Sequence, residues 1–405
     1  MTATLNPPRV TEDARHGKPL TDYYLVGISA ILLCSLGIIM VLSASSAYAG
    51  SKLNSPYEFA IRQAIFLVAG IILALVFARM RPEHLAKLAW PGWALATILL
   101  VVVAISSRSI GERGNTNWLS INNQLAIQPS EFTKLAIVVW AAAIFAARVK
   151  KLDQPKNLVW PFVPFAVVLM ALVLAGRDLG TAMIMGLIVL AILWFIGTPM
   201  RILGTLSAVI AVLVGVLVAA NANRMTRILV WLNPSTNTDI ASQPTAALYA
   251  LASGGFWGVG LGAGRQKWGG LADGAHTDFI FAVIGEELGL IGVLCVLALF
   301  GMLGFAGLRI ALRSDHPFTR ILAAGLSAWF IFQSMINILV VLNVLPVLGI
   351  PLPFISYGGS ALVANLIGLG MLLACARNEP EARQALAARR TKRKPRVMSL
   401  AQSRS

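Results

Sequence analysis

Long apolar runs alternate with short polar segments over most of the 405 residues of the chain. A helix that crosses a bilayer needs about 20 mainly apolar residues, because it rises about 1.5 Å per residue through a hydrocarbon core of about 30 Å. Ten runs are long enough, so the pattern predicts ten transmembrane helices. The predicted spans are residues 24–44, 60–78, 88–105, 132–147, 158–175, 179–196, 202–220, 284–308, 322–345 and 356–376.

Composition agrees with this pattern. Apolar residues make up 57% of the chain, charged residues make up 12%, and the mean hydropathy is +0.76. These values exclude an ordinary soluble domain and indicate a polytopic membrane protein. The predicted fold class is therefore an all-α polytopic membrane protein with ten transmembrane helices and a long extracytoplasmic loop, residues 221–277, between helices 7 and 8.

The distribution of basic residues predicts the orientation. If both termini face the cytoplasm, 23 of the 33 Lys and Arg residues lie in the cytoplasmic segments, and cytoplasmic loops normally carry such an excess. We therefore expect a cytoplasmic N-terminal tail (residues 1–22), a membrane domain (23–378) and a basic cytoplasmic tail (379–405). The orientation places the segment before the eighth span on the outer side.

The net charge of +16 raises the question of nucleic-acid binding. Its densest run directly follows the last span, and a polybasic segment there gains about 1 kcal/mol per residue from anionic lipid. Membrane lipid is therefore the expected partner, with no nucleic acid, and we expect disorder beyond residue 388. The run consists of Arg389, Arg390, Lys392, Arg393, Lys394 and Arg396.

Four acidic residues, Asp273, Asp278, Glu286 and Glu287, lie within fifteen positions at the start of the eighth span. An ionised carboxylate near hydrocarbon costs roughly 2.5–3.5 kcal/mol, so such residues usually mark chemistry, a pathway or an internal ion pair. Asp278 is the candidate catalytic residue; a helix N-cap or an ion pair with Lys134 is the structural alternative. Glu286 and Glu287 are expected to tie the span to its neighbours, and Asp273 to be solvated.

A second polar concentration opens the fourth span, where Glu131 and Lys134 are three residues apart and share a helix face. Such a pair serves substrate contact or structure, and the sequence leaves both open. At the sixth span, Asp178 is expected to be a helix N-cap. Arg227, near the outer end of the seventh span, is suited to a lipid phosphate or to ordinary snorkelling at the interface.

The long outer loop contains a predicted amphipathic helix near residues 244–251 and a glycine-rich run, residues 254–264, followed by Arg265 and Lys267. Glycines let backbone N–H groups approach a phosphate. They also permit a tightly packed turn, and both interpretations remain open.

Residues 345–360 contain three prolines and three glycines without any charge, next to Ser356, Tyr357 and Ser360. Non-helical backbone within a membrane is tolerated where it is buried in protein or lines a wet cavity. We therefore predict that this segment forms a cavity wall at the entry to the tenth span.

Taken together, these motifs resemble the SEDS family, the polytopic glycosyltransferases of bacterial shape, elongation, division and sporulation. The likeness extends over nearly the whole membrane domain. Its motifs are residues 40–46 (MVLSASS), Arg62-Gln63, 128–134 (QPSEFTK), 178–182 (DLGTA), the glycine run, 276–281 (HTDFIF), 285–289 (GEELG) and 352–360.

The resemblance implies that the chain polymerises lipid II, the undecaprenyl-pyrophosphoryl disaccharide-pentapeptide, into peptidoglycan strands at the outer membrane face. Asp278 aligns with the essential acid of the family, and a carboxylate acting as general base can contribute roughly 10²–10⁴ in rate. The leaving pyrophosphate needs cations. The expected substrate-binding residues are Glu131, Lys134, Arg227, Arg265, Lys267, His276, Ser356, Tyr357 and Ser360.

The resemblance also implies partners. We expect lipid II, the undecaprenyl-pyrophosphate-linked glycan, a class B penicillin-binding protein transpeptidase and other divisome proteins. The cofactor prediction is none certain; a divalent cation such as Mg²⁺ is a candidate, although no metal-ligand spacing is visible. Residues 275–276, 284–286 and 43–48 resemble division members of the family. That likeness predicts septal cell-wall synthesis in the bacterial cytoplasmic membrane.

Two positions depart from the family pattern: Asn117 stands where an Arg is common, and Arg177 where a Pro is common.

Two alternative functions share the sequence features described above. A lipid II flippase would also use broken helices and intramembrane charges, and a non-catalytic divisome scaffold would use the basic tails.

Overall fold

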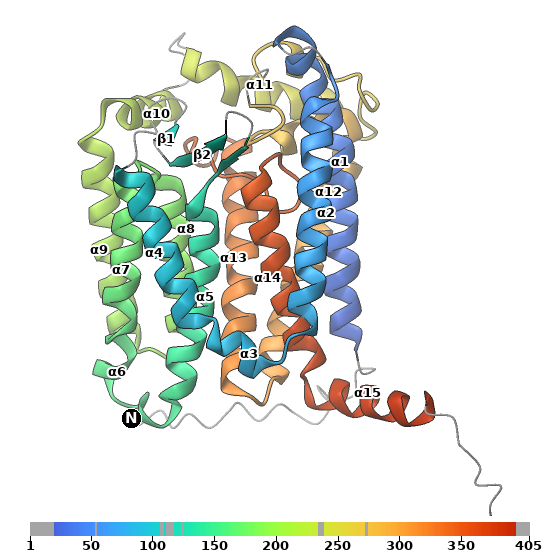
Figure 1. Cartoon of the computed structure of the whole chain (residues 1–405). Helices are drawn as coiled ribbons and strands as arrows, with labels where there is room; N and C mark the ends of the chain where they lie inside the picture. The colour runs from blue at the N-terminus through green and yellow to red at the C-terminus, as the bar shows by residue number, and fades with distance from the viewer. Residues whose placement is uncertain are drawn as a thin grey trace, which may run out of the picture.

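The computed structural model describes residues 20–52, 55–105, 109–110, 117–122, 125–233, 239–271 and 274–393. These residues form a bundle of near-parallel helices, in which the start of the first span and the end of the last lie at the same end (Figure 1). Helices occupy all ten predicted spans. They are α1 (Thr21–Lys52), α2 (Glu58–Arg79), α4 (Ala89–Ile105), α5 (Pro129–Ala147), α7 (Phe162–Ala175), α8 (Leu179–Phe195), α9 (Met200–Ala219), α12 (Ile280–Arg313), α13 (Pro317–Val341) and α14 (Gly359–Arg377).

By length and composition, eight segments of the described chain can cross a membrane, and α4 and α8 are shorter apolar helices of 17 residues. The predicted all-α polytopic fold is confirmed. The helices differ in how deeply they are buried. Within the most apolar stretch of each helix, 89% is buried in α14 and 6% in α9. The helix α14 therefore belongs to the core, and α9 lies at the margin.

The core forms where helices approach closely. The helices α2 and α14 make the most extensive contact in the described chain. A Cβ atom added to Gly370 would lie 2.4 Å from the carbonyl oxygen of Ala74, so only glycine permits this approach. Close packing through small residues is a usual basis of helix association in membranes.

At the end opposite the start of α1 and the end of α14, short elements cover the bundle (Figure 1). The helix predicted near residues 244–251 lies within α11, which is longer than expected. The three-stranded antiparallel sheet of order β1-β2-β3 was not predicted from the sequence, because its strands are very short. These elements are α10 (Ala222–Leu232), α11 (Asp239–Gly254), the 3₁₀ turn η3 (Gln266–Trp268), β1 (Ser109–Ile110), β2 (Trp118–Asn122) and β3 (Leu125–Ile127).

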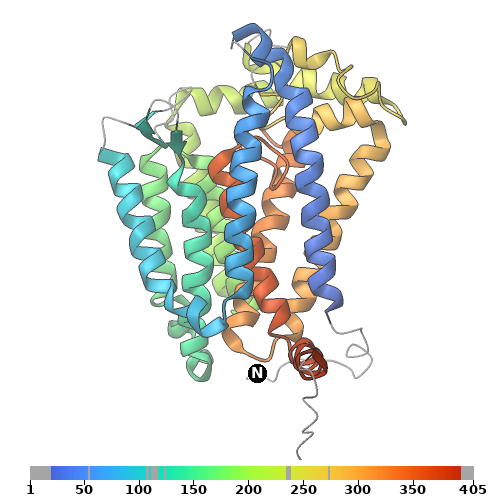
Figure 2. The same cartoon turned by 45° about the vertical axis from the view of Figure 1, so that its right-hand side comes forward.

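The other end carries the short connections α3 (Pro82–Lys87), η2 (Val149–Lys151) and α6 (Pro155–Val159), and the final helix α15 (Pro380–Arg393). The helix α15 crosses the direction of the spans (Figure 2). The expectation of disorder beyond residue 388 was wrong as far as Arg393, because the Ala-, Gln- and Arg-rich sequence continues a favourable helix. The predicted tail before residue 20, Asp273, and the basic residues Lys394 and Arg396 lie outside the described residues.

The eighth span differs from a simple rod. The helix α12 starts four residues before the predicted position and is interrupted at Gly289, whose φ of 65° and ψ of −163° are not helical. Glycine tolerates this conformation at little cost. The interruption gives α12 a short outer segment, residues 280–288, set against the rest of the span.

Candidate active site

Asp278 lies in the turn that leads into α12, and its side chain is half-buried. The N-cap position of α12 is Phe279, which makes no side-chain capping bond, so Asp278 is not the helix N-cap that the sequence left as an alternative. Hydrogen bonds from the segment before α14 and from α13 hold the backbone of this turn.

The first contact joins the turn to the segment before α14. Tyr357 N donates to the carbonyl oxygen of His276 at 2.8 Å. The Ser356 hydroxyl donates to the carbonyl oxygen of Thr277 at 2.7 Å and accepts from Leu352 N at 2.8 Å. Ser356 is 4% exposed. The hydroxyl therefore both donates and accepts inside the protein, which gives Ser356 a scaffold role; its contact with substrate stays a prediction.

The second contact comes from α13. Asn337 Nδ2 donates to the carbonyl oxygens of Asp278 and Ile350, each at 2.8 Å. One amide group thus joins the Asp278 turn to the Pro- and Gly-rich segment. On that segment, a Cβ atom placed on Gly349 would lie 3.6 Å from Oδ2 of Asp278, so the carboxylate lies beside this backbone.

Arg227 reaches the same segment from α10. Its Nη1 donates to the carbonyl oxygen of Val347 at 3.3 Å, two residues before the glycine that lies beside the Asp278 carboxylate. The predicted cation Arg227 and the predicted base Asp278 therefore both lie against the same short segment, residues 347–349. Pyrophosphate contact by Arg227 stays a prediction.

His276 belongs to a cluster of aromatic rings. Its ring centroid lies 4.7 Å from that of Phe59, 5.6 Å from Tyr357 and 5.7 Å from Tyr48. His276 is 5% exposed. Through these rings, α1, α2 and the segment before α14 all contact His276. The cluster therefore helps to hold the backbone two residues before Asp278. Substrate contact by His276 or Tyr357 stays a prediction.

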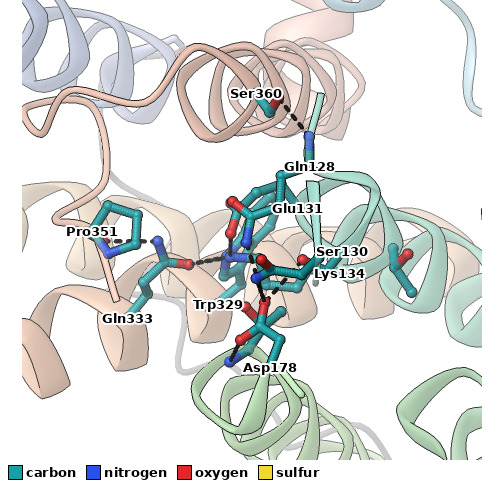
Figure 3. A network of polar contacts seen from close by, with 12 residues as sticks. Gln128, Ser130, Glu131, Lys134, Asp178, Trp329, Gln333, Pro351 and Ser360 are labelled. Carbon is teal, nitrogen blue, oxygen red and sulfur yellow. Dashed lines mark hydrogen bonds and ion pairs between the residues drawn. The ribbon is translucent and has the colours of Figure 1, made fainter. Parts of the chain in front are cut away.

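The predicted Glu131–Lys134 pair forms, and it is buried. Lys134 Nζ lies 2.9 Å from Glu131 Oε1 and donates to Gln333 Oε1 at 2.7 Å, and both charged side chains are 1% exposed. Gln333 also accepts from Trp329 Nε1 at 2.7 Å and donates to the carbonyl oxygen of Pro351 at 2.9 Å. Figure 3 shows this network extending from α5 through α13 to the segment before α14. The pair supports that segment; its direct contact with substrate stays a prediction.

Asp178 is the centre of a neighbouring network. Its Oδ1 accepts from Thr181 N at 2.9 Å, so the predicted N-cap of α8 is confirmed. Its Oδ2 accepts from Asn117 at 2.9 Å, Gln128 at 3.1 Å and Ser130 at 3.2 Å. Asn117, where an arginine was expected, thus has a structural partner.

Ser360 joins this region to α14. Its Oγ accepts from Gln128 N at 3.0 Å, and the side chain is 6% exposed, as Figure 3 shows. The contact fastens the first turn of α14 to the residue before α5. The structure thus gives Ser360 a positioning role, and substrate contact stays a prediction.

The glycine-rich run packs on the outer segment of α12 instead of forming an open nest. Val259 N and Gly260 N donate to the carbonyl oxygens of Glu286 and Glu287 at 2.9 and 3.1 Å. A Cβ atom on Gly254 would lie 1.9 Å from the carbonyl oxygen of Gly285. Tight packing is therefore the interpretation that the structure supports, and the glycines serve close backbone approach.

The carboxylates of Glu286 and Glu287 occupy further N–H groups of the same loop. Glu286 Oε1 accepts from the backbone N of Arg265 at 2.7 Å and of Gln266 at 3.3 Å. Glu287 Oε2 accepts from Gly262 N at 3.1 Å. These N–H groups are used by the protein itself, which argues against the alternative that the loop holds a phosphate. The two glutamates connect the span to a neighbouring element, as expected, and both of their carboxylates point toward the loop.

Lys267 is buried and bound by internal partners. It is 1% exposed, and its ammonium group donates to Glu287 Oε1 at 2.7 Å, Ser43 Oγ at 2.9 Å and the carbonyl oxygen of Gly262 at 2.9 Å. A lysine carries three donors, so these contacts give Lys267 a structural role, and its contact with pyrophosphate stays a prediction.

Arg265 is placed differently. Its side chain is exposed and makes no ion pair within the described part of the chain, while its backbone is bound by Glu286. The glycine-rich loop holds it beside the outer segment of α12. Among the described residues there is no group of three or more His, Cys, Asp and Glu side chains that could hold a metal ion.

Two site residues, Gln333 and Asn337, were missed from the sequence. Both lie in an otherwise apolar run, four residues apart and thus on one face of a helix. Polar side chains inside a span are usually functional, so this spacing was a usable signal. The Ser43 contact with Lys267 and Glu287 was also missed, because nothing local relates these positions.

Comparison with known proteins places this geometry in context. The family model described as "Cell cycle protein", for FtsW, RodA and SpoVE, matches residues 23–381. A relative from Mycobacterium tuberculosis, named as a probable peptidoglycan glycosyltransferase FtsW, is 39% identical over 394 residues, which cover 97% of this chain and 75% of the relative. A Bacillus subtilis protein of the same name is 34% identical over 362 residues, covering 87% and 89%.

Solved structures agree with these sequence relatives. A chain from a peptidoglycan synthase complex, described as coordinating polymerization and crosslinking, superimposes with a TM-score of 0.70 at 26% identity and covers 88% of this chain and 97% of its own. The rod shape determining protein RodA of Thermus thermophilus gives a TM-score of 0.62 at 25% identity, with coverage of 90% and 98%.

Proposed function

Because the chain belongs to the FtsW, RodA and SpoVE family of cell cycle proteins, we propose that it is a peptidoglycan glycosyltransferase that polymerises lipid II. Its relatives at 34–39% identity carry this activity in their names. The apolar helices make it a multi-span membrane protein. Chain extension takes place at the end of the bundle covered by α10, α11 and the small sheet, which is the outer face, and serves septal wall synthesis.

Asp278 is the general base of the reaction. The carboxylate takes the proton from the 4-hydroxyl of the acceptor sugar while that oxygen forms a bond to the anomeric carbon of the donor. The bond from this carbon to the pyrophosphate breaks, and undecaprenyl pyrophosphate leaves. A positioned base of this kind supplies roughly 10²–10⁴ in rate.

The observation that carries this proposal is the contrast between the backbone of Asp278 and its side chain. Backbone contacts from Asn337, Ser356 and Tyr357 fix the turn of residues 276–278. The side chain is half-buried beside Gly349. A carboxylate on a fixed backbone with partial access suits proton transfer to a bound hydroxyl.

Charge on the leaving group is balanced by cations. Arg227 takes this role, since it binds the carbonyl oxygen of Val347, two residues before the glycine beside the Asp278 carboxylate. Any divalent cation such as Mg²⁺ enters with the pyrophosphate, and its removal by a chelator tests this: a requirement for added Mg²⁺ supports the proposal, and full rate without it contradicts it.

The test of function uses purified protein and fluorescently labelled lipid II. We expect wild-type protein to form glycan polymer, and Asp278→Asn and Asp278→Ala to lose at least about 100-fold in rate. Full polymer from either variant would exclude Asp278 as the base. The matched control is Asp315→Asn, an acidic residue at the opposite end of the bundle, which should polymerise normally.

The same preparation separates the alternatives. We propose that a class B penicillin-binding protein associates with the bundle, because a similar chain was solved in a peptidoglycan synthase complex that coordinates polymerization and crosslinking; polymer formed only after its addition supports this. Flipping of lipid II across liposomes by the Asp278 variants, without polymerisation by the wild type, would instead indicate a transporter. Growth supported fully by an inactive variant would indicate a scaffold.

A further inference from the structure

Two amide side chains on α13 contact consecutive carbonyl groups of the segment before α14. Gln333 and Asn337 are separated by four residues, so they lie on one helix face. Gln333 donates to the carbonyl oxygen of Pro351 at 2.9 Å, and Asn337 donates to that of Ile350 at 2.8 Å. Both side chains are buried. The segment is thus bound to α13 at two successive peptide units.

Only Asn337 extends this connection to Asp278. Its second Nδ2 hydrogen is directed at the carbonyl oxygen of Asp278, also at 2.8 Å. The side-chain orientation is fixed by chemistry, because both partners are carbonyl oxygens and only the NH₂ group of the amide can donate to them.

The orientation leaves the other end of the amide unsatisfied. In the part of the chain that the structure describes, Oδ1 of Asn337 is buried without a hydrogen-bond partner. A buried acceptor without a partner costs free energy, and an apolar side chain of similar shape would avoid that cost. The presence of asparagine is therefore explained by its donor group and not by packing.

We propose that Asn337 is a positioning residue for Asp278. It holds the peptide of the candidate base and the Ile350 peptide at one distance, so that the carboxylate keeps its place beside Gly349. The inference rests on the proposed role of Asp278 and adds the residue that keeps this base in a reactive position. A displacement of about 1 Å at a catalytic group can lower the rate about 100-fold.

The same contacts connect the buried ion pair to the base. Lys134 binds Gln333, Gln333 binds the Pro351 peptide, and the adjacent peptide is held by Asn337. Figure 3 shows the first part of this path. Lys134 therefore acts on the reaction through the backbone, whether or not it touches substrate.

The test compares Asn337→Leu, which keeps the approximate size and removes the donor, with wild type in the lipid II assay. We expect kcat to fall about 100-fold, KM for lipid II to change by no more than about twofold, and the acidic limb of the pH profile of kcat/KM to shift. If Asn337→Leu does not fold, Asn337→Ser, which keeps one shorter donor, should lose about tenfold with the same shift.

The matched control is Ser334→Ala on the same helix, since the Ser334 hydroxyl bonds, among the described residues, only to the carbonyl oxygen of Ile331 at 3.0 Å. Its pH profile should equal that of the wild type. A structural role for Asn337 would lower the amount of active protein at every pH without moving the limb, and that result, or an unchanged kcat, would overturn the proposal.

Failure of the proposed function gives a different result. If Asp278→Asn keeps full activity, the base assignment fails regardless of Asn337. If Asp278→Asn is inactive while Asn337→Leu behaves like Ser334→Ala, the base assignment stands and the positioning role alone is wrong.

Discussion

At the scale of single residues, the described part of the chain contains two cation–carboxylate pairs in which both side chains are fully buried, and their sequence signals differ. Glu131 and Lys134 are three residues apart, so their pairing followed from helix geometry. Glu287 and Lys267 are twenty residues apart and also bind Ser43. No periodicity relates these positions, because their contact depends on the path of the glycine-rich loop. From its position in the sequence, Lys267 was predicted to be a substrate cation, whereas its contacts in the structure indicate a role in stability.

Removal of Lys267 should destabilise the protein and leave substrate affinity intact. Lys267→Met leaves Glu287 buried without its cation, and breaking a buried pair costs roughly 3–5 kcal/mol. We expect a clearly lower unfolding temperature in detergent. The protein that remains folded should have the wild-type KM for lipid II.

Arg265→Met is the control for the stability measurement alone, because Arg265 is exposed and two residues away on the same loop. Surface changes of this kind usually stay within about 0.5 kcal/mol. A raised KM in Lys267→Met with unchanged stability would return Lys267 to the substrate site.

At the scale of elements, the glycine-rich loop and the outer segment of α12 form one unit. Each was visible in the sequence, the loop as a run of glycines and the helix as an apolar span. It did not reveal that they pair, because backbone pairing between distant segments leaves no pattern in either. Leu290 N and Ile291 N donate to the carbonyl oxygens of Gly255 and Phe256, directly after the interruption at Gly289. The loop thus supplies partners at the point where the helix lacks its own bonds.

Two glycines of this loop provide a matched pair of substitutions. Gly258 and Gly262 have nearly equal φ values of +78° and +80°, so alanine is strained at both by about 1–2 kcal/mol. An added Cβ meets the carbonyl oxygen of Glu287 at 2.2 Å from Gly258 and nothing within 4 Å from Gly262. Gly258→Ala should therefore lower the unfolding temperature much more than Gly262→Ala. Equal shifts would show that the loop does not pack against α12 in solution.

The segment before α14 shows the limit of prediction for a whole element. Its prolines and glycines correctly indicated broken helix, since such residues cannot continue a regular span. They did not show what holds it in place. The amides that do so, Gln333 and Asn337, come from another span and were hidden within an apolar run.

At the scale of the whole molecule, ion pairs connect the start of α1 to the end of α12. Asp22, at the start of α1, lies 3.5 Å from Arg309 Nε and 3.3 Å from Arg313 Nη1, near the end of α12. Glu379, between α14 and α15, is 7% exposed. Burial, reinforced by the negative charge of Asp22 and opposed by Arg313, raises the pKa of Glu379 to about 8.

This pKa predicts a pH dependence of stability. The ordinary pKa of a glutamate is 4.5, so between about pH 4.5 and 8 the unfolded chain has lost a proton that the folded protein keeps. Stability from this group is complete below pH 4.5 and is lost as the pH rises through about 8.

Glu379→Gln removes the ionisation and should be the more stable protein at pH 8.5, by an unfolding temperature roughly 2 °C or more higher. The difference from wild type should vanish near pH 4. Thermal unfolding of both proteins in the same detergent measures it. Parallel curves across this pH range would show that Glu379 ionises normally in the folded state.

The weak packing of α9 has a consequence for the surrounding membrane. Its 20 residues span about 30 Å, the thickness of an average hydrocarbon core. Since neighbouring helices bury so little of it, a thinner or thicker bilayer should alter the tilt of α9 more readily than that of α14. The next helix, α10, begins three residues after α9 ends and carries Arg227. A mismatch between α9 and the bilayer should therefore shift α10 and with it Arg227, a predicted substrate cation. We expect the activity of the enzyme to depend on bilayer thickness for this reason.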